Sequence, residues 1–349
     1  MQREDNFYFN ELFKLESGAL LPGFQLHYTT FGQLNDAKDN VIWVCHALTA
    51  NSNFLDWWEG LFGKGRLYDP EKYFIICANM LGSCYGSTGP LSVNPETKKP
   101  FYHDFPLLTN RDMVRAFDLL RQSLGIEKIH TVIGGSLGGQ HALEWAIMEP
   151  ERIEHLVQLC SNARHSPWGI AFNESQRMAI EQDPTWPNHE AGAGMKGMAT
   201  ARSIALLSYR HYNTYHKTQG ESTNDKVDHY KASSYQRYQG DKLVRRFNAF
   251  SYWLLSKAMD SHNVARERGS MEEALAKVKA QSLFLGVSTD ILFPVSEQEL
   301  LTERVANAQI AVIDSDYGHD GFLIEVSSLT REIRRFYEKA KPKPAFTDY

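Results

Sequence analysis

The chain has 349 residues, of which 42% are apolar, and its formal net charge at pH 7 is −5. This length exceeds a small single-core module and fits one large domain with an insertion, or two domains. No basic block is present, which argues against a nucleic-acid partner, and no apolar run approaches the ~20 residues of a membrane span.

Strand and helix signals alternate along the first half of the chain. Residues 24–30 alternate apolar and polar, as a half-buried strand does. Short apolar runs predict strands buried on both faces at 41–45, 73–78, 129–133 and 156–160. Helical spacing predicts helices at 112–124 and 137–148, which end at Gly125 and before Pro150. This order predicts an α/β fold with a mostly parallel, doubly wound sheet and helices on both faces.

The pattern changes near Pro167. From there to about residue 275 the sequence predicts helices and polar stretches, and strand signals return at 282–287 and 310–313. We interpret residues 1–166 and 276–349 as two parts of one core, and residues 167–275 as an inserted helical cap. The alternative is two independent domains, but two strands alone make a poor sheet.

Cysteine content and the N-terminal segment bear on the compartment. Four cysteines, at positions 45, 77, 84 and 160, are too few for a disulfide framework in a chain of this length. Residues 1–10 are polar and acidic and lack the basic and apolar regions of a signal peptide. We therefore expect a reduced, cytoplasmic protein.

The segment GGSLG at 134–138 is the clearest chemical signal. It matches G-x-S-x-G, the strand–turn–helix in which a strained serine is exposed as a nucleophile and larger neighbours would collide. A predicted buried strand leads into it and a predicted helix follows. The motif predicts Ser136 as the nucleophile of an α/β-hydrolase fold; the alternative is a glycine-rich turn with an idle serine.

A nucleophilic serine needs a base, and the base needs an orienting acid. In this fold the chain order is Ser, then Asp or Glu, then His. Asp290 follows the strand at 282–287, and His319 is the only histidine after Asp290. Asp290 could instead be a turn or cap residue, His319 could be structural, and Asp314 and Asp316 are rival acids.

The oxyanion of a tetrahedral intermediate needs backbone donors. We assign the N–H of Leu137, directly after the nucleophile, and the N–H of Leu48, in the loop after the strand at 41–45. His46 precedes Ser136 and is interpreted as structural, and Cys84 as a packed thiol. No metal-binding motif and no GxxxxGK[ST] phosphate loop is present.

The chain resembles the homoserine O-acetyltransferase family, a group of homoserine O-acyltransferases of methionine biosynthesis. The resemblance covers nearly the whole chain and rests on segments at 46–49, 79–90, 104–106, 111–114, 134–139, 142–145 and 318–323. The 79–90 segment, NMLGSCYGSTGP, is especially specific.

The resemblance implies a role for further residues. It supports Ser136, Asp290 and His319 as a triad and implies that Arg202 and Asp320 hold the amino-acid substrate. Arg202 suits its carboxylate and Asp320 its ammonium. Tyr209 and Thr49 are implied to lie at the same site.

The activity implied is ping-pong transfer of an acetyl group from acetyl-CoA to the L-homoserine hydroxyl, with no bound cofactor. A homodimer formed through the cap is also implied. The sequence departs from the family at Gln140 and His141, in 194–202 and in 221–239. A succinyl donor, serine as acceptor, an esterase with the same triad and a catalytically idle binding protein are the alternatives.

Overall fold

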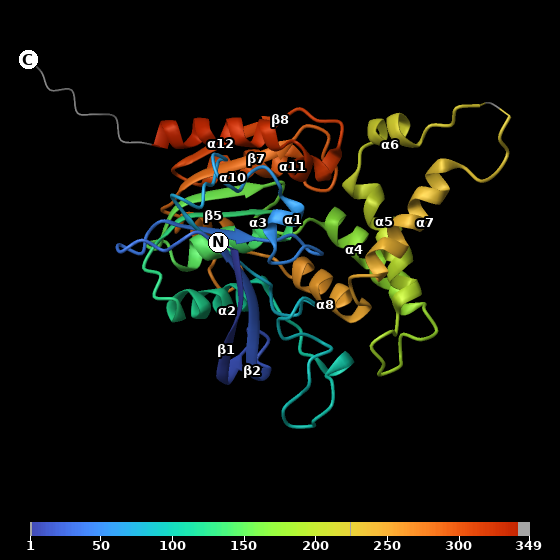
Figure 1. The fold of residues 1–349 in the computed structure, drawn as a ribbon, viewed down its shortest axis with the longest axis horizontal. Helices are drawn as coiled ribbons and strands as arrows, with labels where there is room; N and C mark the ends of the chain where they lie inside the picture. The colour runs from blue at the N-terminus through green and yellow to red at the C-terminus, as the bar shows by residue number, and fades with distance from the viewer. Residues whose placement is uncertain (1, 224, 341–349) are drawn as a thin grey trace, which may run out of the picture.

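The computed structural model describes residues 2–223 and 225–340. Within them, eight strands form one sheet in the order β1-β2-β4-β3-β5-β6-β7-β8 (Figure 1). The neighbours from β4 to β8 pair in parallel, whereas β1 pairs with β2 and β2 with β4 in antiparallel fashion. The predicted mostly parallel sheet is confirmed. The strands are β1 (Gln2–Lys14), β2 (Leu20–Phe31), β3 (Val41–Cys45), β4 (Phe74–Ala78), β5 (Ile129–Gly135), β6 (Ile153–Leu159), β7 (Gln281–Val287) and β8 (Ala308–Ile313).

Alternate side chains of the central strands fill two cores, one on each face of the sheet. On β3, Trp43 packs into the core beside α2 and α3, while its neighbours Ile42 and Val44 point into the core beside α12. All three side chains are fully buried. This two-sided burial explains why the strand is a continuous apolar run rather than an alternating one.

Helices on both faces cover the sheet, as the strand–helix alternation predicts. Thr109 caps α2 in a reciprocal capping box with Asp112, which starts this helix two residues before the predicted position. None of the helices in the described part of the chain is long and apolar enough to cross a membrane. The core helices are α1 (Phe54–Trp57), α2 (Asn110–Ser123), α3 (Leu137–Met148), α10 (Val295–Arg304), α11 (Gly321–Ile324) and α12 (Val326–Ala340), with short 3-10 turns η1 (Tyr102–Asp104) and η2 (Gly318–Asp320).

Between β6 and β7 the described residues form helices and no strand of the sheet. The first four of these helices project from one end of the sheet, at the right of Figure 1. They lie between β6, which follows α3, and β7, which leads to Asp290. The division into core and cap remains a prediction. The helices are α4 (Pro167–Glu181), α5 (Met195–Tyr209), α6 (Tyr212–Gln219), α7 (Lys231–Val244), α8 (Ala249–Asp260) and α9 (Met271–Leu275).

The sequence analysis did not predict the first strand, β1. β1 is thirteen residues long, and most of its side chains are exposed or half-buried, but Phe7, Phe9 and Phe13 form an apolar face that packs against Phe24 of β2. Its backbone groups pair with β2 along nearly the full strand, with one irregularity between Phe9 and Leu12. The long hairpin therefore combines backbone pairing with an apolar face that is set among polar and acidic residues.

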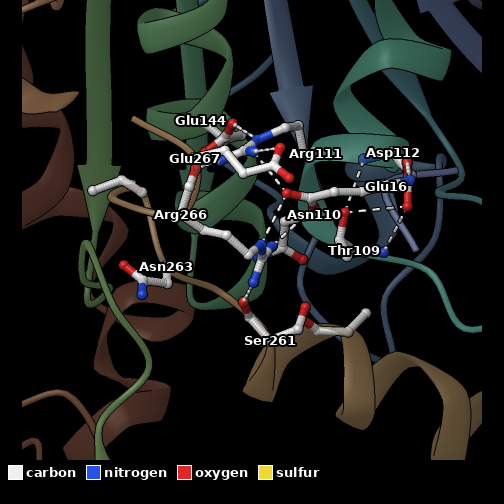
Figure 2. A network of polar contacts seen from close by, with 12 residues as sticks. Glu16, Thr109, Asn110, Arg111, Asp112, Glu144, Ser261, Asn263, Arg266 and Glu267 are labelled. Atoms are coloured by element: carbon white, nitrogen blue, oxygen red, sulfur yellow. Dashed lines mark hydrogen bonds and ion pairs between the residues drawn. The ribbon is translucent and has the colours of Figure 1, made fainter. Parts of the chain in front are cut away.

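A partly buried charge cluster ties the segment that returns from the cap to the core helices (Figure 2). Arg111 on α2 donates to Glu144 on α3 at 2.9 Å and to Glu16 at 2.6 Å. Arg266 donates hydrogen bonds from Nε and Nη2 to the two carboxylate oxygens of Glu16, each at 2.8 Å. Burial raises the pKa of the Glu16 carboxyl, but the hydrogen bond from Arg266 and the charge of Arg111 bring it below its ordinary value. The cluster fixes the end of the cap insertion against α2 and α3.

Candidate active site

Ser136 occupies a strained turn between β5 and α3. Its φ of 57° and ψ of −126° put it in the left-handed half of backbone space, which non-glycine residues rarely adopt. A Cβ added to Gly138 would lie 2.1 Å from the carbonyl oxygen of Cys45, and one added to Gly135 would lie 2.3 Å from the Phe322 ring. The glycines of the motif therefore allow the close packing that this turn requires.

His319 and Asp290 form a buried hydrogen-bonded pair. Nδ1 of His319 lies 2.7 Å from Oδ2 of Asp290. The other carboxylate oxygen, Oδ1, accepts from the backbone N–H groups of Leu292 and Phe293 at 2.8 and 2.9 Å. Asp290 thus caps its own turn, as the structural alternative expected, and also contacts the histidine. Because Nδ1 is engaged with the carboxylate, Nε2 is left as the basic atom of the ring.

One cavity of about 370 Å³ gathers most of the residues named from the sequence. Ser136 and His319 line it together with Leu48, and the substrate-holding candidates line it as well: Thr49, Arg202, Tyr209 and Asp320. Asp290 lies behind His319 and does not line the cavity. The structure therefore brings the proposed nucleophile and base to the same space as the proposed substrate-binding residues.

The two backbone donors assigned to the oxyanion lie next to Ser136 and in the loop after β3. Leu137 is the first residue of α3, where the N–H group has no partner within the helix. Leu48 follows β3 in a turn closed by a 3.0 Å hydrogen bond from the Ala50 N–H to the Ala47 carbonyl. Both positions suit backbone donation, and the oxyanion role remains a prediction.

The far side of the cavity carries opposite charges. The Arg202 guanidinium lies 5.5 Å from the centre of the Tyr209 ring, and the Tyr209 ring centre lies 5.7 Å from that of His319. Burial raises the pKa of the Asp320 carboxyl, although Arg210, Arg202 and His319 act in the opposite direction. A cationic group entering the cavity would find a carboxylate there, and an anionic group would find Arg202.

The structure adds two arginines that the sequence analysis missed. Arg210 donates from Nε to Asp320 at 3.1 Å, so Asp320 already has a cationic partner. Arg246, just after α7, lines the cavity and contacts Thr49. Its position next to Tyr209 is the one feature of the sequence that could have indicated a role for Arg210. Nothing near Arg246 in the sequence indicates its contact with Thr49.

His46 has no free ring nitrogen for catalysis. Its Nε2 accepts from the Met80 N–H at 3.2 Å, and Nδ1 lies 2.9 Å from the Ala47 carbonyl. Burial lowers the pKa of the His46 imidazole to about 4, so the ring is neutral near neutral pH. These contacts support the structural interpretation of His46.

Two groups of described residues have side-chain atoms close enough to suit a metal ion. Sγ of Cys160 and the ligand atoms of Asp290 and His319 lie within 4.8 Å of one another, and the second group is His130, Glu154 and His155. In each group a hydrogen bond already engages a histidine nitrogen: His319 with Asp290, and His155 with the His130 carbonyl at 2.8 Å. We assign no metal to either group.

Comparisons with known proteins agree with this geometry. A family model for the alpha/beta hydrolase fold matches residues 40–326. A homoserine O-acetyltransferase of Cyclobacterium marinum is 54% identical over 334 residues, which cover 96% of this chain and 95% of the relative.

Solved structures are also similar over nearly the whole chain. A homoserine O-acetyltransferase from Bacillus anthracis matches with a TM-score of 0.89 at 26% identity, covering 98% of each chain. A mutant of esterase E22, L374D, matches with a TM-score of 0.89 at 25% identity, covering 98% of this chain and all of the other. The same fold thus accompanies both transfer and hydrolysis among its neighbours.

Proposed function

This chain belongs to the homoserine O-acetyltransferase family of α/β-hydrolase-fold enzymes, and on that premise we propose that it transfers an acetyl group from acetyl-CoA to the hydroxyl of L-homoserine. The observation that carries the proposal is the single cavity in which Ser136 and His319 face the same space as Arg202 and Asp320. A hydrolase needs only the first pair, whereas an amino-acid acceptor also needs partners for its carboxylate and ammonium groups.

In the first half of the reaction, His319 takes the proton of the Ser136 hydroxyl as its oxygen attacks the thioester carbonyl of acetyl-CoA. Asp290 orients His319 through the 2.7 Å hydrogen bond and stabilises the imidazolium. The N–H groups of Leu48 and Leu137 hold the oxyanion. The C–S bond then breaks, His319 returns the proton to the sulfur, and coenzyme A leaves an acetyl ester on Ser136.

In the second half, His319 takes the proton of the homoserine hydroxyl, whose oxygen attacks the acetyl-serine carbonyl. The ester bond to Ser136 breaks, and the serine oxygen recovers its proton from His319. Arg202 pairs with the carboxylate of the acceptor, and Asp320 takes its ammonium while sharing a contact with Arg210. Thr49 and Tyr209 complete the wall around the acceptor.

Transfer must compete with hydrolysis of the acetyl-serine. Apolar side chains next to the nucleophile limit water, namely Leu48, Phe322 and Leu323. The matched esterase structure makes hydrolysis the second candidate function, with water in place of homoserine. A succinyl donor or a serine acceptor would use the same residues, and the names of the relatives favour the acetyl donor and homoserine.

We further propose a cytoplasmic homodimer formed through the cap. Large apolar side chains are exposed on its helices: Trp168, Ile170 and Met178 on α4, Leu207 on α5 and Tyr238 on α7. Such side chains are common in interfaces between copies of a chain. Light scattering of the full chain tests this, since a mass of one chain at all concentrations would contradict the dimer.

The direct test of the proposed function is release of free thiol from acetyl-CoA and from succinyl-CoA, each with L-homoserine, with L-serine and with no acceptor. The proposal expects rapid release only for acetyl-CoA with L-homoserine. Equal release with and without an acceptor would identify a hydrolase. Preference for succinyl-CoA or for L-serine would correct the substrate while leaving the acyl-serine chemistry in place.

A further inference from the structure

We propose that Arg246 is a positioning residue that holds the oxyanion loop, defined here as residues 47–50, in its catalytic conformation. The inference rests on the proposed function, because it assigns a role to a residue that supports the Leu48 N–H. If the inference is right, acylation of Ser136 requires that the segment after α7, which carries Arg246, be correctly placed.

The contacts of Arg246 converge on the residue that follows Leu48. Nη1 donates to the backbone carbonyl of Thr49 at 2.5 Å, and Nη2 lies 3.4 Å from the Thr49 hydroxyl. Within the loop the Ala50 N–H donates to the Ala47 carbonyl, and His46 Nδ1 lies 2.9 Å from that same carbonyl. These contacts hold the start of the turn, whereas Arg246 joins Thr49 to a segment 197 residues away.

The guanidinium is itself held in place from the opposite side. Nη1 also donates to the Tyr85 hydroxyl at 2.7 Å, and the Tyr85 ring packs edge-on against Phe247 at 5.7 Å between centroids. The Cys84 thiol contacts the Arg246 carbonyl at 3.8 Å. Two residues of the 79–90 segment thus fix Arg246, and Arg246 fixes Thr49.

This arrangement matters because a backbone donor stabilises an oxyanion only when it is held in advance. Misplacement of a catalytic group by about 1 Å can cost about 100-fold in rate. Both short contacts come from Nη1, whose two N–H groups have fixed directions in the guanidinium plane, whereas the three N–H groups of an ammonium rotate freely. A lysine at position 246 would keep the charge but would not hold Thr49 and Tyr85 in this fixed geometry.

The alternative role for Arg246 is binding of an anionic group of the acyl donor, because its side chain lines the cavity and is exposed to solvent. Nη1 of Arg246 already donates to oxygens of Thr49 and Tyr85, and Nη2 lies near the Thr49 hydroxyl, which favours positioning. The two roles differ in one respect that can be measured: a small neutral ester carries no phosphate, but its acylation of Ser136 still needs the oxyanion donors.

The experiment compares Arg246→Lys with wild type and with Arg245→Lys, a matched control at the exposed neighbouring position. Acylation of Ser136 is measured in single turnovers with acetyl-CoA and with p-nitrophenyl acetate. Positioning predicts that Arg246→Lys slows acylation by both donors to a similar extent, roughly tenfold to a hundredfold. Arg245→Lys should behave as wild type.

A loss confined to acetyl-CoA, seen as a raised KM for that donor, would overturn the proposal in favour of phosphate binding, and unchanged acylation with both donors would overturn it outright. If the wild-type protein accepts the ester but not acetyl-CoA, the proposed function fails while the ester still tests Arg246. Backbone hydrogen exchange at residues 47–50 provides a readout that needs no activity. Exchange should be faster in Arg246→Lys and unchanged in Arg245→Lys. Equal exchange in the two variants would contradict the proposal that Arg246 holds the oxyanion loop.

Discussion

His319 Nδ1 and Asp290 Oδ2 lie 2.7 Å apart, although 29 residues separate them in the chain. Asp290 follows β7 and His319 follows β8, and these strands are parallel neighbours in the sheet. The carboxyl ends of parallel strands meet at one edge, so both side chains reach the edge where β5 delivers Ser136.

Replacement of the acid tests this pairing. Asp290→Asn keeps an oxygen for the N–H groups of Leu292 and Phe293 but no longer holds His319 in the required tautomer. We expect the rate of acetyl transfer to fall by about 10³ to 10⁴. Asp314→Asn is the matched control, because Asp314 is exposed and is one of the two rival acids in the sequence, with Asp316. Steady-state kinetics that show a larger loss in Asp314→Asn would transfer the role to that residue.

The acceptor site can be tested separately from the nucleophile. Arg202→Lys keeps the charge but loses the bidentate fork that fits a carboxylate. We expect the KM for L-homoserine to rise by about tenfold or more, while acetylation of Ser136 by acetyl-CoA keeps its wild-type rate. Arg245→Lys should leave both quantities unchanged. Slower acetylation with an unchanged KM would remove Arg202 from the acceptor site.

The packing around the nucleophile predicts a strict requirement for glycine at position 138. An added methyl group would meet the Cys45 carbonyl at 2.1 Å, and backbone cannot move away as a flexible side chain can. We expect Gly138→Ala to lower the free energy of unfolding by ~1–3 kcal/mol and to reduce activity. Gly192→Ala, with no atom within 4 Å of the added group, should stay within about 0.5 kcal/mol of wild type. Urea denaturation measures both, and equal stability of the two variants would contradict the packing argument.

Buried histidines predict how stability depends on pH. Burial lowers the pKa of His165 and of His262 to about 3 and that of His46 to about 4. The unfolded chain takes up protons on these side chains near pH 6.5, where the folded protein does not. Stability is therefore complete above about pH 6.5 and falls as the pH drops toward 4, by about 1.4 kcal/mol per pH unit for each such histidine.

Unfolding in urea at a series of pH values measures this slope. His262→Gln should make the slope shallower, whereas His216→Gln should not change it, because His216 is exposed on α6. A stability that stays constant or rises as the pH falls through this window would contradict the burial of these rings in the neutral form.

The parts of the fold that the sequence predicts well are those with one dominant local signal. β3 and α3 have the predicted bounds because a short run buried on both faces and a helix between the serine turn and Pro150 leave few other choices. Motif and chain order also select Ser136, Asp290 and His319 as the proposed triad, and the structure brings Asp290 and His319 into contact. β1 was missed because its apolar face, formed by Phe7, Phe9 and Phe13, is set in a polar and acidic segment.

The contacts of Asp320 and Thr49 could not be predicted from the sequence, because they join residues that lie far apart in the chain. Arg210 meets Asp320 across 110 residues, and Arg246 meets Thr49 across 197. Such pairs depend on how the helices between β6 and β7 pack against the rest of the chain, and no local pattern in the sequence encodes that path. The resemblance to a family supplied Arg202 and Asp320, but only the structure supplies the partners of Asp320 and Thr49.

The most direct test of the account is mass spectrometry of the intact protein in a single turnover. Mixed with acetyl-CoA alone, the wild-type protein should gain the mass of one acetyl group on Ser136, and Ser136→Ala should gain none. Addition of L-homoserine should then remove that mass and yield O-acetylhomoserine in equal amount. An acetyl group on Ser136 that is lost to water at the same rate with and without L-homoserine would instead identify a hydrolase, and the absence of any acetylated serine would contradict the central claim.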